Sequence, residues 1–357
     1  MADRVTDEWL TMACPQPCPE YAASAQARQD RLTKPQGSLG VLERLAVQLA
    51  AFQQTDRPQA GNVPIVLFAG DHGITAQGVS AYPSAVTVQM LHNFANGGAA
   101  ISVLARELGV SLQVVDAGTV AASEIAGVIR DKPRLGTRDF SSEPAMMEDE
   151  VRFALAAGRR AVQRAADSNV DLIILGEMGI GNTTSASAVA AALLGSSPSD
   201  VVGAGTGLNA DGIGHKASVI AAALAKHGLS PSSAPLGVMA CVGGLEIAAL
   251  AGAVIAAAQA RLPVLVDGFI VSVAALAAVR LNASCQPWLL YSHRSSEHGH
   301  RKVLEALNAD PILDLKLRLG EGSGAAVALP IVRLACALHS QMATFDQAHV
   351  SGRESCL

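Results

Sequence analysis

The most specific arrangement of chemically useful residues in this sequence is a glycine-rich segment, residues 176–184, which reads GEMGIGNTT. Glycine turns expose backbone N–H groups, and a helix that follows adds a positive field at its N-terminus, so the segment predicts a phosphate site. Its spacing is similar to that of a P-loop, but Asn182 stands where a P-loop has its lysine, which favours a phosphate monoester over a triphosphate. A tight strand–helix crossover that needs glycine only for packing is the alternative.

A second glycine-rich segment, residues 203–207, is followed by Lys216. It predicts further N–H donors for the same phosphate, with the lysine as the cation. A solvated lysine on a helix surface is the alternative for Lys216. The predicted phosphate contacts are Gly179, Gly181, Asn182, Thr183, Gly205, Gly207 and Lys216.

A third segment, residues 319–326, places one carboxylate, Glu321, among three glycines directly before an apolar stretch. Glycine neighbours let a ligand approach closely and leave the Glu321 side chain little cover of its own. A carboxylate that is desolvated by a bound aromatic ring has a raised pKa, which suits a general base. The alternative is a glutamate that complements a helix dipole.

A flat aromatic ligand is suggested by the stretch 78–83, which contains a tyrosine and leads into a helical pattern carrying a methionine. A planar tyrosine and a polarizable methionine are suited to line such a pocket, although both are also common core residues. The predicted contacts with the ring are Ser80, Tyr82, Pro83, Gln89, Met90 and Leu319.

The elements that must position these segments are short, nearly continuous apolar runs that alternate with helical stretches, a pattern typical of parallel strands buried on both faces. The runs are residues 63–69, 112–116, 170–175, 263–266 and 288–291. We therefore predict an α/β fold, with a three-layer open parallel sheet and helices on both faces.

Every predicted strand is followed by polar residues or glycine, and the exits of parallel strands lie along one edge, where ligands bind. Aspartate and glycine that merely make turns and caps are the alternative for any single loop. The residues predicted at the rim of the cleft are Asp71, His72, Ser292 and His293.

Composition excludes several other classes of function. The net charge of the chain is −5, without a long basic run, which argues against nucleic acid as a partner. The histidines lack an HExxH motif and Cys14 and Cys18 lack a second cysteine pair, so we predict no metal and free thiols. The N-terminal residues lack an apolar core, and the Ala-rich stretch 236–260 is interrupted by glycines and Glu246, which predicts a cytoplasmic protein without a membrane span.

Five segments, in order along the chain, resemble the nicotinate-nucleotide–dimethylbenzimidazole phosphoribosyltransferase family. They are residues 34–40, 69–73, 176–184, 292–295 and 319–325. The resemblance implies a homodimer, a large α/β domain with the active site over residues 62–324, and a small helical domain formed by residues 1–61 together with 325–357. It also implies that Glu321 is the catalytic base. The residues 296–298 depart from the pattern expected around the glutamate of that loop.

The reaction implied by this resemblance transfers the phosphoribosyl group of nicotinate mononucleotide to dimethylbenzimidazole, without a cofactor. The pyridinium leaves as a neutral base, so a single general base suffices where a glycosidase uses two carboxylates. We expect Glu321 to be this base and Glu177 to stabilise charge on the ribose, with inversion to the α-ribotide. The alternatives are transfer to another aromatic base or to water, a P-loop phosphotransferase, and a nucleotide-binding module without catalysis.

Overall fold

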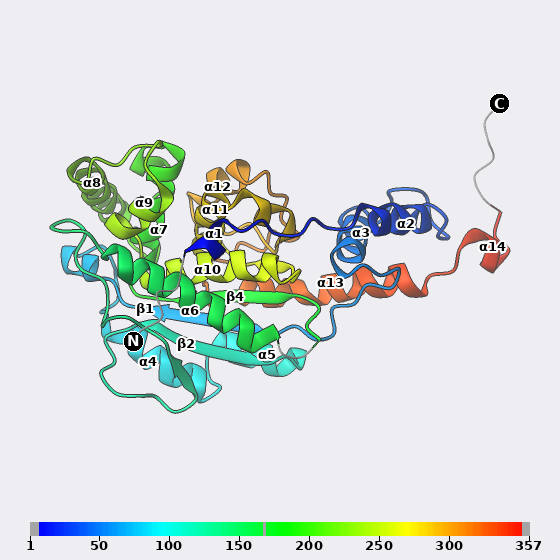
Figure 1. Cartoon of the computed structure of the whole chain (residues 1–357), viewed down its shortest axis with the longest axis horizontal. Coiled ribbons are helices and arrows are strands. Elements are labelled where there is room, and N and C mark those ends of the chain that lie inside the picture. Colours follow the sequence, from blue (N-terminus) through cyan, green and yellow to red (C-terminus); the bar gives the residue numbers. More distant parts are fainter. Residues whose placement is uncertain (1–6, 167–168, 352–357) are drawn as a thin grey trace.

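The computed structural model describes residues 7–166 and 169–351. Its centre is a six-stranded, fully parallel sheet with the order β3-β2-β1-β4-β5-β6 (Figure 1). The strands are β1 (Ile65–Gly70), β2 (Leu112–Gly118), β3 (Val128–Arg130), β4 (Ile173–Met178), β5 (Val264–Val266) and β6 (Leu289–Tyr291). This confirms the predicted fold class.

Five of these strands coincide with the predicted apolar runs, with ends displaced by up to three residues in β4. The sixth, β3, escaped prediction because it is only three residues long and lies at the sheet edge, where its residues are partly exposed. β1 is buried along its whole length, as its continuous apolar sequence requires.

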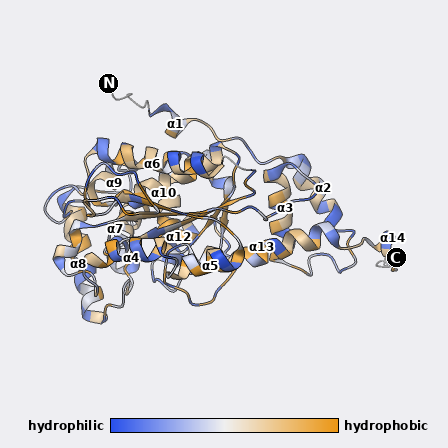
Figure 2. Ribbon diagram, turned by 90° about the horizontal axis from the view of Figure 1, so that it is seen from below, coloured by the Kyte–Doolittle hydropathy of each residue, from blue (hydrophilic) through white to orange (hydrophobic). Residues whose placement is uncertain are grey.

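Helices cover both faces of the sheet and make three layers (Figure 2). One face carries α6 (Glu148–Ala166), α10 (Leu245–Gln259) and α11 (Phe269–Leu281), and the other carries α4 (Ala85–Ala95) and α5 (Ala100–Leu108). α10 is buried through most of its length, which explains its almost continuous small and apolar sequence. Gly158 of α6 and Gly252 of α10 lie against the partner helix backbone, where a Cβ would collide with a carbonyl oxygen. Small residues therefore allow these two helices to approach closely.

The remaining helical elements connect the strands or lie near the chain ends. They are α1 (Glu8–Thr11), α2 (Pro19–Gln29), α3 (Val41–Gln53), η1 (Gly73–Gln77), α7 (Asn182–Leu194), η2 (Pro198–Asp200), α8 (Ala210–Lys226), α9 (Pro235–Val242), η3 (Ala283–Trp288), α12 (His300–Ala306), α13 (Ser323–Gln341) and α14 (Phe345–Ala348).

A smaller helical unit projects from one end of the sheet body, where α2 and α3 pack beside α13 (Figure 1). Arg28 of α2 joins the two chain ends by donating to the carbonyl oxygen of His339 at 2.7 Å. α1 instead lies on the sheet body, where Gln259 donates to the carbonyl oxygen of Trp9 and Asn282 to that of Leu10. The division at residue 61 stays a prediction, and α1 contacts the larger part.

α13 leaves the carboxyl edge of the sheet and runs out into the helical unit (Figure 1). By length and composition alone it is one helix that could cross a membrane, but core helices of soluble proteins pass the same test, and 56% of its most apolar window is buried within the protein. Its N-cap, Gly322, directly follows Glu321, so this helix connects the helical unit to the strand exits.

Candidate active site

The strand order reverses between β1 and β4, and in open parallel sheets ligands bind at such a reversal, beyond the carboxyl ends of the strands. A cavity of about 610 Å³ lies beside this reversal, beyond the carboxyl ends of β4, β5 and β6. It is lined by the loops that follow β4, β5 and β6, by α4, and by residues 316–321. The exits of β1 and β2 do not reach the lining, so three of the five predicted loops meet in this cavity.

One end of the cavity is a cradle of backbone and cationic groups. Gly181, with a φ of 93°, is the N-cap of α7, and Asn182 and Thr183 form the first turn of that helix. The Lys216 ammonium donates to Thr183 Oγ1 at 2.7 Å, directly behind Gly205. N–H groups, a hydroxyl and an ammonium that converge in this way suit a phosphate.

Lys216 is fully buried, which excludes the alternative of a solvated surface lysine. Burial lowers the pKa of Lys216 to about 8, although the nearby Glu297 carboxylate opposes this shift. Of the predicted phosphate contacts, Gly179, Asn182, Thr183 and Gly205 line the cavity, whereas Gly181, Gly207 and Lys216 do not belong to the lining itself. Lys216 reaches the cradle through Thr183.

Two charged residues of this cradle were missed by sequence reasoning. Arg318 lines the cavity and donates to the carbonyl oxygen of Gly205 at 3.1 Å. Glu297, from the loop after β6, lines it as well and keeps one buried oxygen without a hydrogen-bond partner. Burial raises the pKa of Glu297, while Lys216 and Arg318 lower it. Glu297, the middle residue of the departure at 296–298, therefore lies in the cavity wall. The adjacent 292–295 motif was the sequence signal that could have identified it.

Glu321 lies in a strained turn at the other side of the cavity. Gly320, Glu321 and Gly322 have φ values of 87°, 64° and 83°, so three consecutive residues are left-handed. Glu321 Oε2 accepts a hydrogen bond from the N–H of Ile101 at 3.1 Å, in the first turn of α5. The side chain thus caps α5, a helix distant in sequence, while it lines the cavity.

The environment of Glu321 favours proton uptake. Burial raises the pKa of Glu321, the Asp267 carboxylate raises it further, and the Ile101 N–H opposes both. Glu177 lies beside it at the end of β4, where its carboxylate accepts a hydrogen bond from the Asn182 side chain. Burial, with the charges of Asp267 and Glu246, raises the pKa of Glu177 to about 8. Two carboxylates of raised pKa thus face one cavity, a pattern typical of functional sites.

Several other lining residues of the cavity are apolar. Tyr82, Met90 and Leu319, three of the predicted contacts with a flat ring, belong to the lining. Sequence reasoning missed further apolar members of the lining, namely Val86, Met178, Ile180 and Phe269. Ser80, Pro83 and Gln89 lie outside the lining.

The structure separates the four residues that were predicted at the rim. His293 lines the cavity, and Ser292 lies buried next to it with its hydroxyl 3.1 Å from His293 Nδ1. His72 lies below the phosphate loop, with its ring nitrogens 2.7 Å from Glu246 and 2.9 Å from Ser185. Asp71 is buried and accepts a hydrogen bond from the N–H of Val120. His72 and Asp71 therefore belong to the support of the loops and not to the rim.

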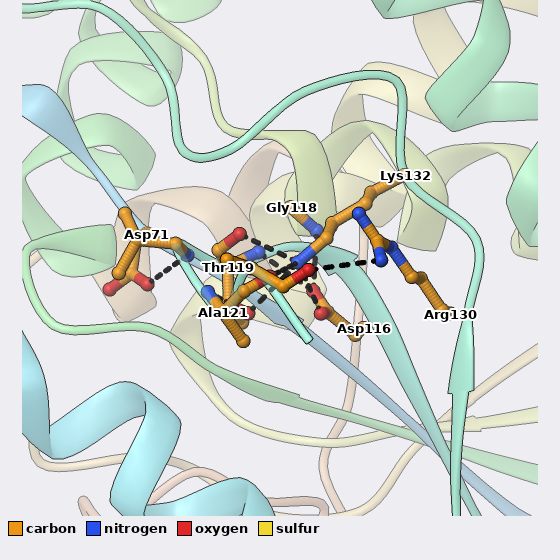
Figure 3. A network of polar contacts seen from close by, with 9 residues as sticks. Asp71, Asp116, Gly118, Thr119, Ala121, Arg130 and Lys132 are labelled. Atoms are coloured by element: carbon orange, nitrogen blue, oxygen red, sulfur yellow. Dashed lines mark hydrogen bonds and ion pairs between the residues drawn. The ribbon is translucent and has the colours of Figure 1, made fainter. Parts of the chain in front are cut away.

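In the other half of the carboxyl edge, near the ends of β2 and β3, the polar side chains bind one another and the backbone (Figure 3). The side chain of Lys132, after β3, is buried and donates to Asp116, near the carboxyl end of β2, and to the carbonyl oxygens of Thr119 and Ala121. The Lys132 ammonium and the Asp116 carboxylate therefore satisfy each other, and these two charges need no ligand. In residues 7–166 and 169–351, no group of three or more His, Cys, Asp or Glu residues is arranged to hold a metal ion.

Comparisons with known proteins identify the family of the chain. A family model described as phosphoribosyltransferase matches residues 14–350. A nicotinate-nucleotide–dimethylbenzimidazole phosphoribosyltransferase from Bradyrhizobium sp. BTAi1 is 64% identical over 98% of this chain and 99% of its own length. One from Pseudomonas putida KT2440 is 57% identical over 98% and 99%. The crystal structure of such an enzyme from Thermus thermophilus superposes with a TM-score of 0.89 at 44% identity, covering 94% of this chain and 100% of that one.

Proposed function

The chain belongs to the nicotinate-nucleotide–dimethylbenzimidazole phosphoribosyltransferase family. From this premise we propose that it transfers the 5-phosphoribosyl group of nicotinate mononucleotide to 5,6-dimethylbenzimidazole. The products are α-ribazole 5′-phosphate and nicotinate, and the reaction serves the assembly of the nucleotide loop of cobalamin. The observation that carries the proposal is a single cavity with a phosphate cradle at one side and Glu321 in a strained turn at the other.

The cradle binds the phosphate of the mononucleotide. Thr183, Gly205 and the α7 N-terminus supply hydrogen-bond donors, and Lys216 and Arg318 supply positive charge. A bound phosphate dianion favours the ammonium form of Lys216, whose pKa burial lowers to about 8 in the free protein. Phosphate binding and protonation of Lys216 are therefore coupled.

Glu321 accepts the proton of the incoming base. One ring nitrogen of the benzimidazole attacks C1′ of the ribose, and the N–H of the other nitrogen loses its proton to the Glu321 carboxylate. The bond between C1′ and the pyridinium nitrogen breaks, and its electron pair leaves with nicotinate, which needs no general acid. Burial raises the pKa of Glu321, which makes it a better proton acceptor. Attack from the face opposite the leaving group gives the α-ribotide.

Glu177 stabilises the positive charge that grows on the ribose. In the free protein burial raises its pKa to about 8, which favours the neutral carboxyl group. The pyridinium of the bound mononucleotide places a cation in the same cavity and favours the carboxylate form. Glu177 thus becomes negatively charged when the substrate that needs this charge has bound.

An assay with nicotinate mononucleotide, dimethylbenzimidazole and excess chelator tests this function, with release of nicotinate as the measurement. Wild-type protein is expected to release nicotinate only with the benzimidazole, and Glu321→Gln to be slower by about 10²–10⁴, as for loss of a general base. Glu150→Gln is the matched control, because Glu150, in α6, is partly buried and ion-paired with Arg138, away from the cavity.

Product analysis separates the alternative functions. Ribose 5-phosphate in the absence of a benzimidazole indicates a hydrolase, and mononucleotide binding without release of nicotinate indicates a binding module. Equal rates for wild type and Glu321→Gln would leave the reaction in place and assign the base to another residue. Competition between dimethylbenzimidazole and other flat bases defines which aromatic base is preferred.

We also propose a cytoplasmic homodimer. Tyr82, Leu315 and Leu319 remain more than half exposed close to the cavity, and a second copy would cover such apolar side chains. A charged mononucleotide does not cross a bilayer unaided, so its enzyme is expected in the compartment that produces it. Sedimentation equilibrium tests the dimer, and cell fractionation tests the location. A monomer at micromolar concentration would contradict the first proposal.

A further inference from the structure

Asp267 stands at the carboxyl end of β5, between the cavity and the first turn of α13, and the mechanism above gives it no task. Its side chain is 1% exposed, yet it belongs to the cavity lining. A carboxylate buried to this degree is unfavourable unless neighbouring groups compensate it.

One compensating group is His293, whose Nδ1 lies 3.7 Å from Asp267 Oδ1, and the others include N–H groups that follow Glu321. Asp267 Oδ1 accepts a hydrogen bond from the N–H of Ala325 at 2.9 Å, and Oδ2 accepts one from the N–H of Gly322 at 3.2 Å. These are N–H groups that the first turn of α13 leaves without intrahelical partners. Asp267 thus fixes the end of the turn that follows Glu321.

The turn needs this support because its backbone is strained. Glu321 adopts a φ of 64°, a conformation that costs free energy for a residue with a side chain. On the opposite side, the N–H of Glu321 donates to the carbonyl oxygen of Glu177 at 3.2 Å. Gly176 of β4 packs against the Glu321 carbonyl group so closely that a Cβ would collide with it. The turn is therefore held between β4 and Asp267.

The charge of Asp267 also acts on Glu321. The groups that face Glu321 are Glu177 at the end of β4, Asp267 after β5, His293 after β6 and the N-terminus of α5. Burial raises the pKa of Glu321, and Asp267 raises it further. Burial also raises the pKa of Asp267, but His293 and backbone N–H groups oppose this shift. Only an ionised carboxylate presents two acceptor oxygens without a proton to the two N–H groups, so the contacts fit the charged form.

We propose that Asp267 is a positioning residue of this active site: its carboxylate holds the Gly320–Gly322 turn in the geometry that aims Glu321 into the cavity, and its charge strengthens Glu321 as a proton acceptor. The inference rests on the proposed phosphoribosyl transfer. It concerns a residue that contacts the catalytic turn and not the reacting atoms.

The test is the variant Asp267→Asn, which keeps the size of the side chain but loses its charge and one acceptor. We expect kcat to fall by about 10–10², since small misplacement of a catalytic group has effects of this size. KM for nicotinate mononucleotide should stay within about twofold of wild type, since a positioning residue adds little ground-state binding. The acid limb of the pH profile of kcat/KM should move to lower pH, because Glu321 loses a neighbour that raises its pKa.

Asp116→Asn is the matched control. Asp116 lies near the carboxyl end of β2 as a buried carboxylate, but it pairs with Lys132 outside the cavity. Its loss should therefore lower thermal stability and leave kcat and the pH profile unchanged. A second variant, Asp267→Glu, keeps the charge of the side chain and makes it longer by one methylene group. It should retain the wild-type acid limb and still lose kcat, and this comparison remains available where Asp267→Asn does not fold.

Three outcomes overturn the inference while wild-type protein is active. A raised KM for nicotinate mononucleotide at unchanged kcat makes Asp267 a substrate contact. A lower melting temperature with wild-type kcat and pH profile makes it a purely structural residue. Wild-type kcat in Asp267→Glu shows that the position of the carboxylate is unimportant. Inactive wild-type protein instead contradicts the proposed function itself.

Discussion

The two halves of the carboxyl edge of the sheet treat their charged side chains differently. Near the ends of β2 and β3, Asp116 pairs with Lys132. Near the ends of β4 and β5, no lysine or arginine contributes to the pKa shift of Glu177 or Asp267. Both halves bury charged side chains at the ends of parallel strands. In the first half the ammonium also meets two backbone carbonyl oxygens, so the group is satisfied within the protein (Figure 3). In the second half the carboxylates face a cavity.

The difference shows how to separate a structural charge from a functional one. A buried pair that is fully hydrogen-bonded stabilises a loop, and removal of one partner leaves the other uncompensated. A buried group whose pKa is displaced towards its neutral form, such as Lys216 or Glu177, lacks that compensation in the free protein. A ligand of opposite charge can supply it, which is why perturbed groups mark the half that binds substrate.

Lysine-to-methionine substitutions in the two halves give the largest expected contrast. Lys216→Met should raise KM for nicotinate mononucleotide by about 10²–10³, as for loss of a buried charge pair of about 2–5 kcal/mol, with little change in melting temperature. Lys132→Met should keep KM but lower the free energy of unfolding by about 3–5 kcal/mol, because Asp116 remains buried and unpaired. Steady-state kinetics and urea unfolding of both variants measure this. The same change of KM in both variants would contradict the assignment of Lys216 to substrate binding and of Lys132 to stability.

Glycine substitutions sharpen the comparison at the level of the backbone. A Cβ at Gly176 would displace the Glu321 carbonyl group, so Gly176→Ala should lower kcat by about 10–10² through misplacement of the catalytic turn. A Cβ at Gly118 of β2 would press on the Leu245 side chain, so Gly118→Ala should cost about 1–3 kcal/mol of stability by overpacking. Kinetics below the melting temperature of each variant separate the two effects. Normal kcat in Gly176→Ala would show that the turn tolerates displacement.

The pH dependence of stability gives the smallest expected effect. Burial raises the pKa of Glu177 from 4.5 to about 8, so between these values the folded protein holds a proton that the unfolded chain has released. The free energy of unfolding should therefore fall as the pH rises from about 4.5 to 8, by at most a few kcal/mol. Melting curves of wild type and Glu177→Gln from pH 5 to 8 test this, since the substitution should reduce the slope and leave the part that comes from the other buried acids.

Glu150→Gln is the control for that slope. Burial raises the pKa of Glu150, but Arg138 and the Met147 N–H lower it, and the net shift is downward. The stability that Glu150 contributes is complete above its ordinary pKa and is lost only at lower pH. Removal of Glu150 should leave the slope between pH 5 and 8 unchanged. The same slope in wild type and Glu177→Gln would contradict the contribution assigned to Glu177.

Much of the site could be predicted from local sequence, because the chemistry depends on glycine-rich turns whose residues are neighbours in the chain. The segments around Glu177 and Glu321 were found in this way, and both line the cavity. Asp267, Glu297 and Arg318 were missed as site residues, because an acid or a base at the end of an element is common and only its distant neighbours give it a task. β3 was missed because three residues carry too little pattern.

The alternation of strands and helices, the glycine-rich turns and the family could all be read from the order of the residues, since these depend on periodicity and on contiguous residues. Which strand exits share the cavity, and which are closed by ion pairs, depends on how the chain folds. The fold also buries Lys216 behind Thr183 and places Glu321 as a cap of α5, more than two hundred residues away in the chain. Burial and long-range pairing set the charge state of these groups, and neither is a property of the local sequence.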